Sequence, residues 1–288
     1  MSSPSLCFAG ERGSFGEDAA LAFLAASRLI AVPTFRDVFE AIAQEAANGG
    51  VVPIENVSQG TVREVYDLLL EHELVIVGEV EVPVQLCLAA LPGQTLDDIG
   101  RVYSHAQALS QAEPFLATRN WMLLASTTTA SAGAAIAQRQ EMGAAAVLSV
   151  RAARLHGLEI LASDIQSTAR NRTRFLVLAR EAAPAWIPPS GDAHGRGGFR
   201  TTICFGAANA PGSLLRVLEV LARHGLNMSK LESRPSRERD WEYVFWVDLD
   251  GDLCAPAAAA AHQELSAVTL SLRVIGCYAA AGAPPTTR

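Results

Sequence analysis

The segment Asn171-Arg-Thr-Arg-Phe175 combines side chains that can bind and activate an anionic substrate. Two guanidinium groups flank one hydroxyl, immediately before the apolar run Leu176–Ala179. An arginine can bind a carboxylate through two parallel hydrogen bonds, and a threonine between two such anchors can donate to a neutral or departing oxygen. A solvated basic loop beside an edge strand would have the same composition. The rest of the chain decides between these two interpretations.

Four further polar segments follow predicted strands, each near the carboxyl end of its strand. They are the loop with Ser14, the run Glu55–Ser58, the pair Ser104-His105, and the hydroxyl cluster that contains Thr127. The carboxyl ends of strands are where open α/β sheets bind ligands. We therefore expect these segments and Asn171–Phe175 to surround one cleft between two sheet-bearing lobes.

Strands and helices alternate up to about residue 180. Predicted strands cover residues 6–9, 50–54, 74–82, 84–89, 102–103, 121–125, 144–148, 160–165 and 176–179; predicted helices cover 17–27, 35–46 after the N-cap Thr34, 61–72, 105–116, 130 onward and 150–155. This alternation predicts an α/β domain with largely parallel sheets.

The chain changes character after residue 180. Residues 181–198 are rich in proline and glycine and have no periodicity, which predicts a linker. Residues 199–279 then show a βαββαβ pattern, with strands at 199–206, 226–233, 243–249 and 270–278 and helices at 213–224 and 255–267. This pattern is typical of a ferredoxin-like fold. The remaining residues, 280–288, are predicted to be a disordered tail.

Composition limits the partners and the compartment. Half of the residues are apolar and the net charge is -7, without the basic stripe and interleaved aromatic residues of a nucleic-acid-binding protein. Apolar runs are too short to cross a bilayer, so no membrane contact is expected. The five cysteines (Cys7, Cys87, Cys204, Cys254 and Cys277) are scattered, without metal-ligand spacing. They predict reduced core thiols, no metal site and, with no recognisable signal peptide, a cytoplasmic protein.

Several of these segments occur together in an order that matches a known family. They are residues 50–60, Tyr66–Leu69, Ser104-His105 with Gln107, Asn171–Phe175, Leu231–Pro235 and Trp241–Tyr243. Over about residues 5–279 the chain resembles the prephenate dehydratases of phenylalanine biosynthesis, with their C-terminal ACT regulatory domain. The resemblance implies a bilobal, periplasmic-binding-protein-like catalytic domain at 5–180, an ACT domain at 199–279, and conversion of prephenate to phenylpyruvate, water and carbon dioxide without a cofactor.

The resemblance also implies roles for individual residues. Thr173 aligns with the family's essential threonine and is expected to donate to the leaving hydroxyl, while Arg174, with Arg172 as a second candidate, binds a carboxylate. His105 is either an acid or a structural histidine, and Glu55 is either an orienting carboxylate or a charge at a helix N-terminus. The remaining expected site residues are Asn56 and Ser58, with catalytic roles, and Ser14, Ser104, Gln107, Thr127, Asn171 and Phe175, with substrate contacts.

The ACT domain of the family implies phenylalanine as a feedback effector. The expected pocket combines a loop and helix start with a strand from a second copy of the chain, so a homodimer or homotetramer is expected. Its residues are Asn209, Pro211, Gly212, Ser213 and Leu214 on one side, and Glu232, Ser233, Arg234 and Pro235 on the other. Without the resemblance, a helix cap and a strand-end salt bridge would explain the same residues.

Departures from the family pattern leave alternatives open. Gly16, Ala106, Ser167 and Ser213 replace residues that are usual in the family. The chain could act on arogenate instead of prephenate, could decarboxylate prephenate without aromatising it, or could be an amino-acid sensor with no catalysis. A periplasmic solute-binding protein is disfavoured by the missing signal peptide.

Overall fold

The computed structural model describes residues 3–25, 27–168, 170–187, 198–236 and 243–281. It divides into two compact units, residues 1–72 with 80–176, and residues 73–79 with 177–288. Most of the predicted linker, residues 188–197, and most of the predicted tail, residues 282–288, lie outside the described residues. Within the described part of the chain, no helix is long and apolar enough to cross a membrane.

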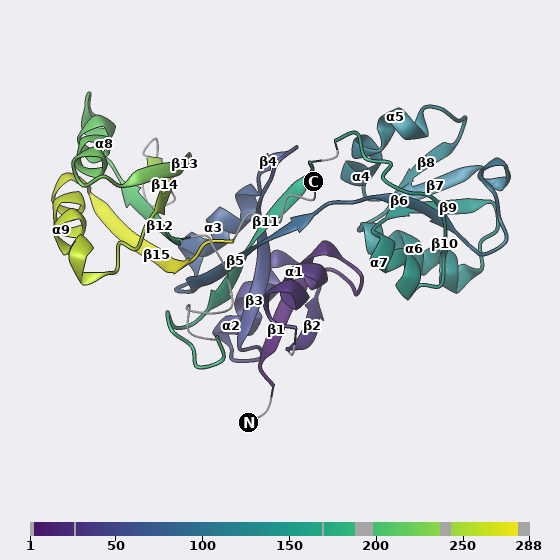
Figure 1. Cartoon of the computed structure of the whole chain (residues 1–288), viewed down its shortest axis with the longest axis horizontal. Helices are drawn as coiled ribbons and strands as arrows, with labels where there is room; N and C mark the ends of the chain where they lie inside the picture. Colours follow the sequence, from purple (N-terminus) through teal and green to yellow (C-terminus); the bar gives the residue numbers. More distant parts are fainter. Residues whose placement is uncertain (1–2, 26, 169, 188–197, 237–242, 282–288) are drawn as a thin grey trace. The chain divides into compact units, whose positions relative to one another are not determined.

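The first lobe is built on a sheet in the order β2-β1-β3-β11-β5 (Figure 1). Its strands are β1 (Ser5–Ala9), β2 (Arg28–Val32), β3 (Gly49–Asn56), β5 (Val75–Pro83) and β11 (Arg172–Ala179), and the short β4 (Gly60–Thr61) pairs with β3. Its helices are α1 (Phe15–Phe23), α2 (Phe35–Ala43) and α3 (Arg63–Glu71). The predicted N-cap of α2 is confirmed, because Thr34 and Asp37 form a reciprocal capping box.

The second lobe carries a sheet in the order β10-β6-β9-β7-β8. Its strands are β6 (Cys87–Ala90), β7 (Arg101–Ser104), β8 (Met122–Ala125), β9 (Ala144–Leu148) and β10 (Glu159–Ala162); its helices are α4 (Ala106–Gln111), α5 (Glu113–Leu116), α6 (Thr129–Arg139) and α7 (Val150–Leu155). Here the prediction of largely parallel sheets is only half right. β7 is parallel to β8 and β9, but β6 and β10, which carry the chain into and out of the lobe, are antiparallel to their neighbours.

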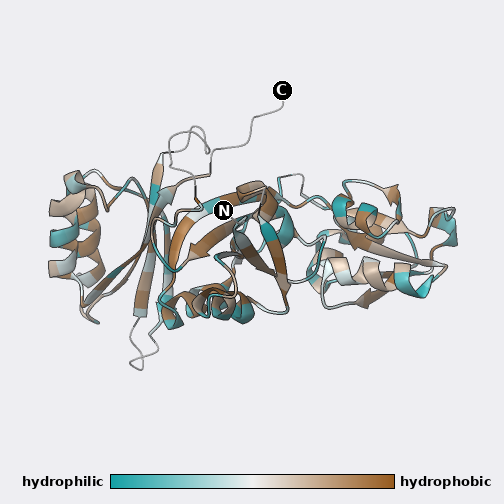
Figure 2. Ribbon diagram, turned by 90° about the horizontal axis from the view of Figure 1, so that it is seen from below, coloured by the Kyte–Doolittle hydropathy of each residue, from teal (hydrophilic) through white to brown (hydrophobic). Residues whose placement is uncertain are grey.

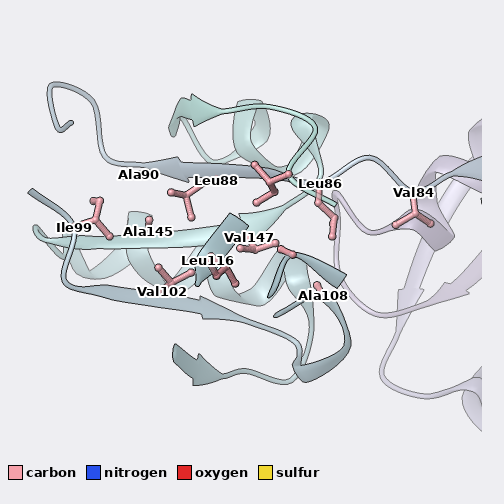
Figure 3. Packing of buried hydrophobic residues seen from close by; sticks show 12 residues of the cluster. Val84, Leu86, Leu88, Ala90, Ile99, Val102, Ala108, Leu116, Ala145 and Val147 are labelled. Atoms are coloured by element: carbon pink, nitrogen blue, oxygen red, sulfur yellow. The ribbon is translucent and has the colours of Figure 1, made fainter. Parts of the chain in front are cut away.

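The core of the second lobe lies on both faces of this sheet. Leu88 and Val147 are fully buried and belong to one cluster with residues of α4 and α5 (Figure 3). On the other face, small residues allow close packing, since a Cβ on Gly133 of α6 would lie 2.6 Å from Leu148 Cδ1. The abundant alanines of β9 and α6 therefore bring helix and sheet closer together than larger side chains would permit.

The second unit contains the predicted ferredoxin-like fold. Its antiparallel sheet runs in the order β13-β14-β12-β15, from β12 (Phe199–Gly206), β13 (Asn227–Pro235), β14 (Tyr243–Asp250) and β15 (Ser271–Ala279). The helices α8 (Ser213–Arg223) and α9 (Ala259–Val268) turn their apolar residues toward the sheet (Figure 2). This confirms the α/β class with a βαββαβ second domain.

The prediction of five reduced thiols is wrong for two cysteines. Cys254 and Cys277 form a disulfide between the segment after β14 and strand β15, whereas Cys7, Cys87 and Cys204 are free and buried. The two sulfurs come from residues 23 positions apart, and only the fold brings their Cα atoms to 6.4 Å. Asp252 lies close to these two cysteines, and the three residues carry atoms of the kind that bind metal ions. Both cysteine sulfurs are engaged in the disulfide.

Several helices and strands differ from those predicted from the sequence, and most of these differences have an identifiable cause. Strands β2 and β4 were not predicted, because β2 is half-exposed and has no clear alternation, and β4 has only two residues. The predicted helix over 105–116 is interrupted at Ala112, since Pro114 in the first turn of α5 lacks the N–H that a continuous helix needs. Helix α1 ends at Phe23 instead of extending to Ser27.

Candidate active site

A cleft of about 580 Å³ opens between the two lobes of the first unit. Its floor includes Thr173 and Phe175 of β11 and Asn56 of β3. Its walls are formed by apolar residues of both lobes and by the first residues of five helices. The lining residues are Ala9, Gly10, Phe15, Gly16, Pro33, Thr34, Phe35, Val51, Pro53, Val62, Glu64, Val84, Leu86, His105, Gln107, Ala108, Gln111 and Thr127–Thr129.

The N-termini of helices α1, α2, α3, α4 and α6 all reach this cleft. Three of them, α1, α2 and α6, have hydroxyl N-caps, of which Thr34 and Thr128 themselves line the cavity. A helix N-terminus carries free N–H groups and a partial positive charge, both of which favour bound anions. None of the described lining residues is an arginine or a lysine. The groups on the described cleft lining that favour an anion are therefore helix N-termini and not cationic side chains.

Asn56 is the centre of a hydrogen-bond network on the cleft floor. Its Oδ1 accepts from the backbone N–H groups of Ser58 at 3.0 Å and Gln59 at 3.1 Å. These two donors fix the orientation of the amide, so its Nδ2 faces Thr173 Oγ1 at 2.9 Å and Asn171 Oδ1 at 2.9 Å. Asn56 and Asn171 are buried, and Thr173 is 9% exposed.

This network sets the direction of the Thr173 hydroxyl. An amide nitrogen has no lone pair to offer, so Thr173 Oγ1 must act as the acceptor toward Asn56. The hydroxyl hydrogen then remains available to another acceptor, and the side chain borders the cleft. Thr173 is consequently arranged as a hydrogen-bond donor to whatever occupies the cavity.

The two arginines beside Thr173 lie in a different place. Residues of a strand point alternately to its two faces, and Arg172 and Arg174 line a separate pocket of about 200 Å³ together with Glu55 and Glu81. Arg174 Nη2 lies 3.6 Å from Glu55 Oε2, and Arg172 Nη1 lies 3.6 Å from Glu81 Oε2. Asn56 lines both this pocket and the cleft, so it is the direct connection between them.

Two titratable side chains line the cleft, counting only the described residues: His105 and Glu64. His105 is the N-cap of α4, and its Nδ1 accepts from the backbone N–H of Gln107 at 3.3 Å. This hydrogen bond requires a bare Nδ1, which places the proton of the neutral imidazole on Nε2. Glu64 is an exposed residue in the first turn of α3 and was not predicted.

The other predicted site residues fall into two groups. Gln107, Thr127 and Phe175 line the cleft. Ser14, Ser58 and Ser104 are held in hydrogen bonds beside it: Ser14 caps α1, Ser58 donates to Asn171 Oδ1 at 3.2 Å, and the fully buried Ser104 donates to the Val147 carbonyl at 2.6 Å. The roles expected of both groups stay predictions.

Some residues that line the cleft were not expected from the sequence. Thr34 belongs to a helix start, and Gln111 lies four positions after Gln107 on α4, whereas Thr128 and Thr129 belong to the hydroxyl cluster that was expected there. An i, i+4 spacing puts Gln111 on the same helix face as Gln107, so this residue could have been found from the sequence. Thr34 could not be found in this way, because the approach of its helix start to the cleft depends on tertiary packing.

The residues expected to bind phenylalanine lie at two separate places of the second unit. Asn209, Pro211 and Leu214 belong to the turn and first residues of α8, where Gly212 is the N-cap with φ 79°, a conformation that favours glycine. Residues 232–235 lie on the edge strand β13, and β14 separates that strand from β12, which leads into the turn. Part of the related motif, Trp241-Glu242, lies outside the described residues.

Comparison with known proteins extends over both domains. The sequence profile of prephenate dehydratase matches residues 6–183, and that of the ACT domain matches residues 201–267. The chain is 37% identical over 282 residues to arogenate dehydratase/prephenate dehydratase 2, chloroplastic, of Arabidopsis thaliana, covering 95% of this chain and 72% of that protein.

Two solved structures resemble the whole chain. The structure of prephenate dehydratase in complex with L-Phe from Arthrobacter aurescens has a TM-score of 0.83 at 28% identity, over 96% of this chain and 90% of that one. The structure of GqqA, described as a novel type of quorum quenching acylase, has a TM-score of 0.85 at 31% identity, over 99% and 100%. The profile match, the relative and the order of the two domains agree, and the chain belongs to the prephenate dehydratase family with a C-terminal ACT domain.

Proposed function

We propose that this enzyme converts prephenate to phenylpyruvate in the cleft between its two lobes. The ring carboxylate leaves as carbon dioxide, its bonding electrons complete the aromatic ring, and the ring hydroxyl leaves as water after taking up one proton. The observation that carries this proposal is the Thr173 hydroxyl, which accepts from Asn56 and thus has its own hydrogen free for the departing oxygen. A neutral threonine is too weak an acid to supply the proton, so it positions and polarises the leaving group.

The substrate dianion is held by the helix N-termini. Thr128 and Thr129 at the start of α6 offer their hydroxyls to one carboxylate, and Thr129 also offers its backbone N–H, whereas the N–H of Thr128 is donated to Ser131 Oγ. The apolar side chains of Phe15, Phe175 and Leu86 cover the ring and exclude water. Arg174 remains the alternative anchor, with Arg172 as the second candidate, and it would act from the smaller pocket on the other face of β11.

The proton comes from one of the two titratable side chains of the cleft. His105 would donate from its imidazolium form through Nε2, and in that form Nδ1 carries a hydrogen and no longer accepts from the Gln107 N–H. Glu64 would donate as a carboxylic acid. The pH dependence of kcat distinguishes the two candidates. In the wild type, kcat should fall with rising pH as the proton donor loses its proton. This fall should be absent from the pH profile of the variant that replaces the donor, either His105→Gln or Glu64→Gln.

An assay of phenylpyruvate formation by the purified full chain tests the proposed reaction. Thr173→Val removes the donor while keeping the shape, and it should lower kcat by more than about tenfold, equivalent to ~1.4 kcal/mol. Thr173→Ser keeps a hydroxyl and should retain most of the activity. Turnover of the valine variant within tenfold of the wild type would rule out a catalytic donor at this position.

Free phenylalanine is the proposed effector of the ACT domain. The turn before α8 would bind its carboxylate and the edge strand β13 of a second copy would complete the pocket, which fits the separation of these two segments within one chain. The active species is therefore a homodimer or homotetramer. Isothermal titration calorimetry with phenylalanine, beside rate measurements with and without it, tests this: absence of both heat and inhibition would exclude it.

Arogenate is the second candidate substrate. The Arabidopsis relative carries both dehydratase names. Arogenate has an amino group where prephenate has a ketone, and the leaving groups are the same. Parallel kcat/KM measurements on the two compounds decide the preference.

The likeness to GqqA raises acyl hydrolysis as another activity. Such a reaction needs a nucleophile beside a base. Thr173 instead accepts from an amide, and Ser104 donates to a backbone carbonyl. We therefore expect no hydrolysis of an N-acyl amide probe under conditions in which phenylpyruvate forms.

The proposed domain limits are those expected from the sequence: 5–180 for catalysis, 181–198 for the linker and 199–279 for regulation. A cytoplasmic location is proposed with them, and fractionation of producing cells tests it.

A further inference from the structure

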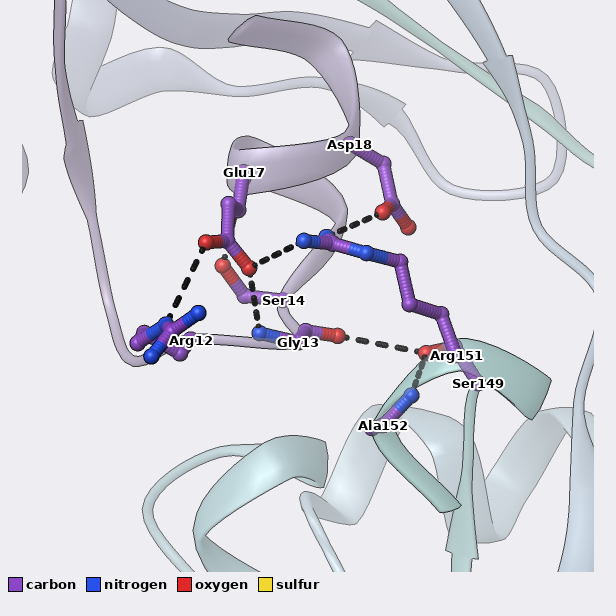
Figure 4. A network of polar contacts seen from close by, with 8 residues as sticks. All are labelled: Arg12, Gly13, Ser14, Glu17, Asp18, Ser149, Arg151 and Ala152. Atoms are coloured by element: carbon purple, nitrogen blue, oxygen red, sulfur yellow. Dashed lines mark hydrogen bonds and ion pairs between the residues drawn. The ribbon is translucent and has the colours of Figure 1, made fainter. Parts of the chain in front are cut away.

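A network of charged residues joins the loop before α1 to helix α7 of the other lobe (Figure 4). The carboxylate of Glu17 accepts from the Gly13 backbone N–H at 2.7 Å and pairs with Arg151 Nη2 at 2.8 Å. The same guanidinium donates through Nη1 to Asp18 Oδ1 at 2.6 Å. Arg12 Nε adds a longer contact of 3.7 Å to Glu17.

A second set of contacts brings the backbones of the two lobes together at the same place. Ser149 Oγ donates to the Gly13 carbonyl at 3.2 Å while it accepts from Ala152 N at 3.0 Å as the N-cap of α7. A Cβ on Gly13 would lie 3.0 Å from the Ala152 Cα and Cβ. Gly13 also has φ +85°, so both the space and the conformation require glycine here.

The loop that these contacts hold is a wall of the cleft. Gly10, Phe15 and Gly16 line the cavity, and Phe15 also packs against the hydrophobic core of the second lobe. One short segment of the first lobe is therefore attached to the second lobe through an ion pair, a hydrogen bond from the Ser149 side chain to a backbone carbonyl, and an aromatic side chain. A shift of this segment would change the width of the cleft directly.

We propose that Glu17 and Arg151 are positioning residues whose ion pair fixes the Gly10–Phe15 wall to the second lobe and sets the lobe separation at which the substrate binds. This inference rests on the proposed function, because the substrate is taken to be prephenate in this cleft. Neither residue lines the cavity among the residues described, so both act through the wall and not by touching the substrate.

The burial of the Glu17 carboxylate explains why breaking the ion pair would displace the segment. The Glu17 side chain is only 4% exposed, and a buried carboxylate needs both a counter-charge and hydrogen bonds. Burial raises the pKa of the Asp18 carboxyl, and the hydrogen bond and charge of Arg151 oppose that rise. Without Arg151, two carboxylates would lie close together with less compensation, and the segment would move to hydrate them.

The test compares Arg151→Met, Glu17→Gln and the double variant with the wild type in the phenylpyruvate assay. Each single change should raise KM by roughly tenfold or more and leave kcat within about threefold, because a loosened wall weakens binding of substrate and transition state alike. The double variant should be no worse than the worse single variant, since both break one pair. Arg151→Lys, which keeps the charge, should recover part of the KM.

The matched control is Arg101→Met. It breaks the ion pair of Arg101 with Glu141, at 3.2 Å and at similar exposure, but both residues lie within the second lobe. Its KM should match the wild type even if its melting temperature falls. An equal rise of KM in this control, or an unchanged KM in Arg151→Met, would overturn the proposal.

Hydrogen exchange of the segment 10–17 gives a second readout that needs no substrate. Arg151→Met should accelerate exchange in this segment, where the Gly13 amide is bonded to the Glu17 carboxylate, and Arg101→Met should not. Unchanged protection in Arg151→Met would also overturn the proposal. If the wild type forms no phenylpyruvate, the proposed function fails, while the exchange experiment still decides whether this ion pair holds the wall.

Discussion

Asn56 donates a hydrogen bond from Nδ2 to Thr173 Oγ1 at 2.9 Å, although 117 positions separate the two residues in the chain. The bond joins the ends of β3 and β11 on the cleft floor. Thr173 therefore accepts a hydrogen bond from Asn56 and can donate its own hydroxyl hydrogen into the cleft. A departing hydroxyl group of the substrate requires such a donor.

Reversing the direction of this hydrogen bond should slow catalysis strongly, with some loss of stability, because the Asn171 Oδ1 and the Arg172 carbonyl would lose their hydrogen bonds from Asn56. In Asn56→Asp the carboxylate can still accept from the Ser58 and Gln59 N–H groups, but it also draws the Thr173 hydrogen away from the cleft. We expect kcat to fall by roughly a hundredfold, about 2.7 kcal/mol, with near-native circular dichroism. Steady-state kinetics check this, and a kcat close to the wild-type value would contradict the donor role.

The two candidate carboxylate anchors can be separated by their effects on KM. Thr128→Ala removes a hydroxyl in the cleft and the cap of α6, so we expect a rise in KM of roughly tenfold for prephenate and a helix destabilisation of about 1 kcal/mol. Arg174→Met acts on the smaller pocket beside Glu55 and should change KM less.

The comparison needs a control for the lost cap. Thr95→Ala removes the hydroxyl of the capping box at Leu96–Asp98, whose residues do not line the cleft, and serves this purpose. If Arg174→Met shows the larger rise in KM, the carboxylate is held by the guanidinium and the helix-terminus assignment is wrong.

The packing of β3 against α2 predicts a strong effect at Gly50. A Cβ there would lie 2.5 Å from Val38 Cγ1 and 2.9 Å from Cys7 Sγ. Gly50→Ala should therefore cost about 1–3 kcal/mol in the free energy of unfolding. Gly100→Ala is the control, since its Cβ would meet only the Gly143 carbonyl at 4.0 Å. Urea titrations measure both, and equal stabilities would show that the core adjusts at no cost.

The cysteines predict a definite pattern of thiol labelling. Burial raises the pKa of Cys7 to about 12, of Cys87 to about 11 and of Cys204 to about 12. Because the reactive thiolate is then nearly absent at pH 8, the folded chain should not react with a thiol reagent. Unfolding without reductant should expose three thiols, and unfolding with reductant all five. Five thiols without reductant would contradict the Cys254–Cys277 disulfide.

Local signals were sufficient for most individual elements. Thr34 is the predicted N-cap of α2 and also forms a capping box with Asp37, and Gly157 has the positive φ expected of a residue that follows a helix. Such features depend on neighbouring residues, so a short stretch of sequence contains them. Strand β11 was placed too late, at Leu176 instead of Arg172. That shift hid the alternation that separates Thr173 from its two arginines.

Contacts between segments far apart in the chain could not be predicted from local sequence patterns. The Cys254–Cys277 bond, the antiparallel course of β6 and β10 and the attachment of Gly13 to Ser149 each join segments whose own composition does not reveal the partner. Each depends on strand order and on the docking of one lobe against the other. These are properties of the whole packed unit.

The sequence by itself determined the family, the two-domain organisation and the segments that supply the site, because motifs and hydrophobic periodicity are carried by neighbouring residues. Only the tertiary structure decided which of those side chains meet. It placed Thr173 in the cleft and Arg174 in another pocket, because the pleat of β11 turns successive residues to opposite faces. It also brought Asn56 to Thr173, which gave the hydroxyl its direction.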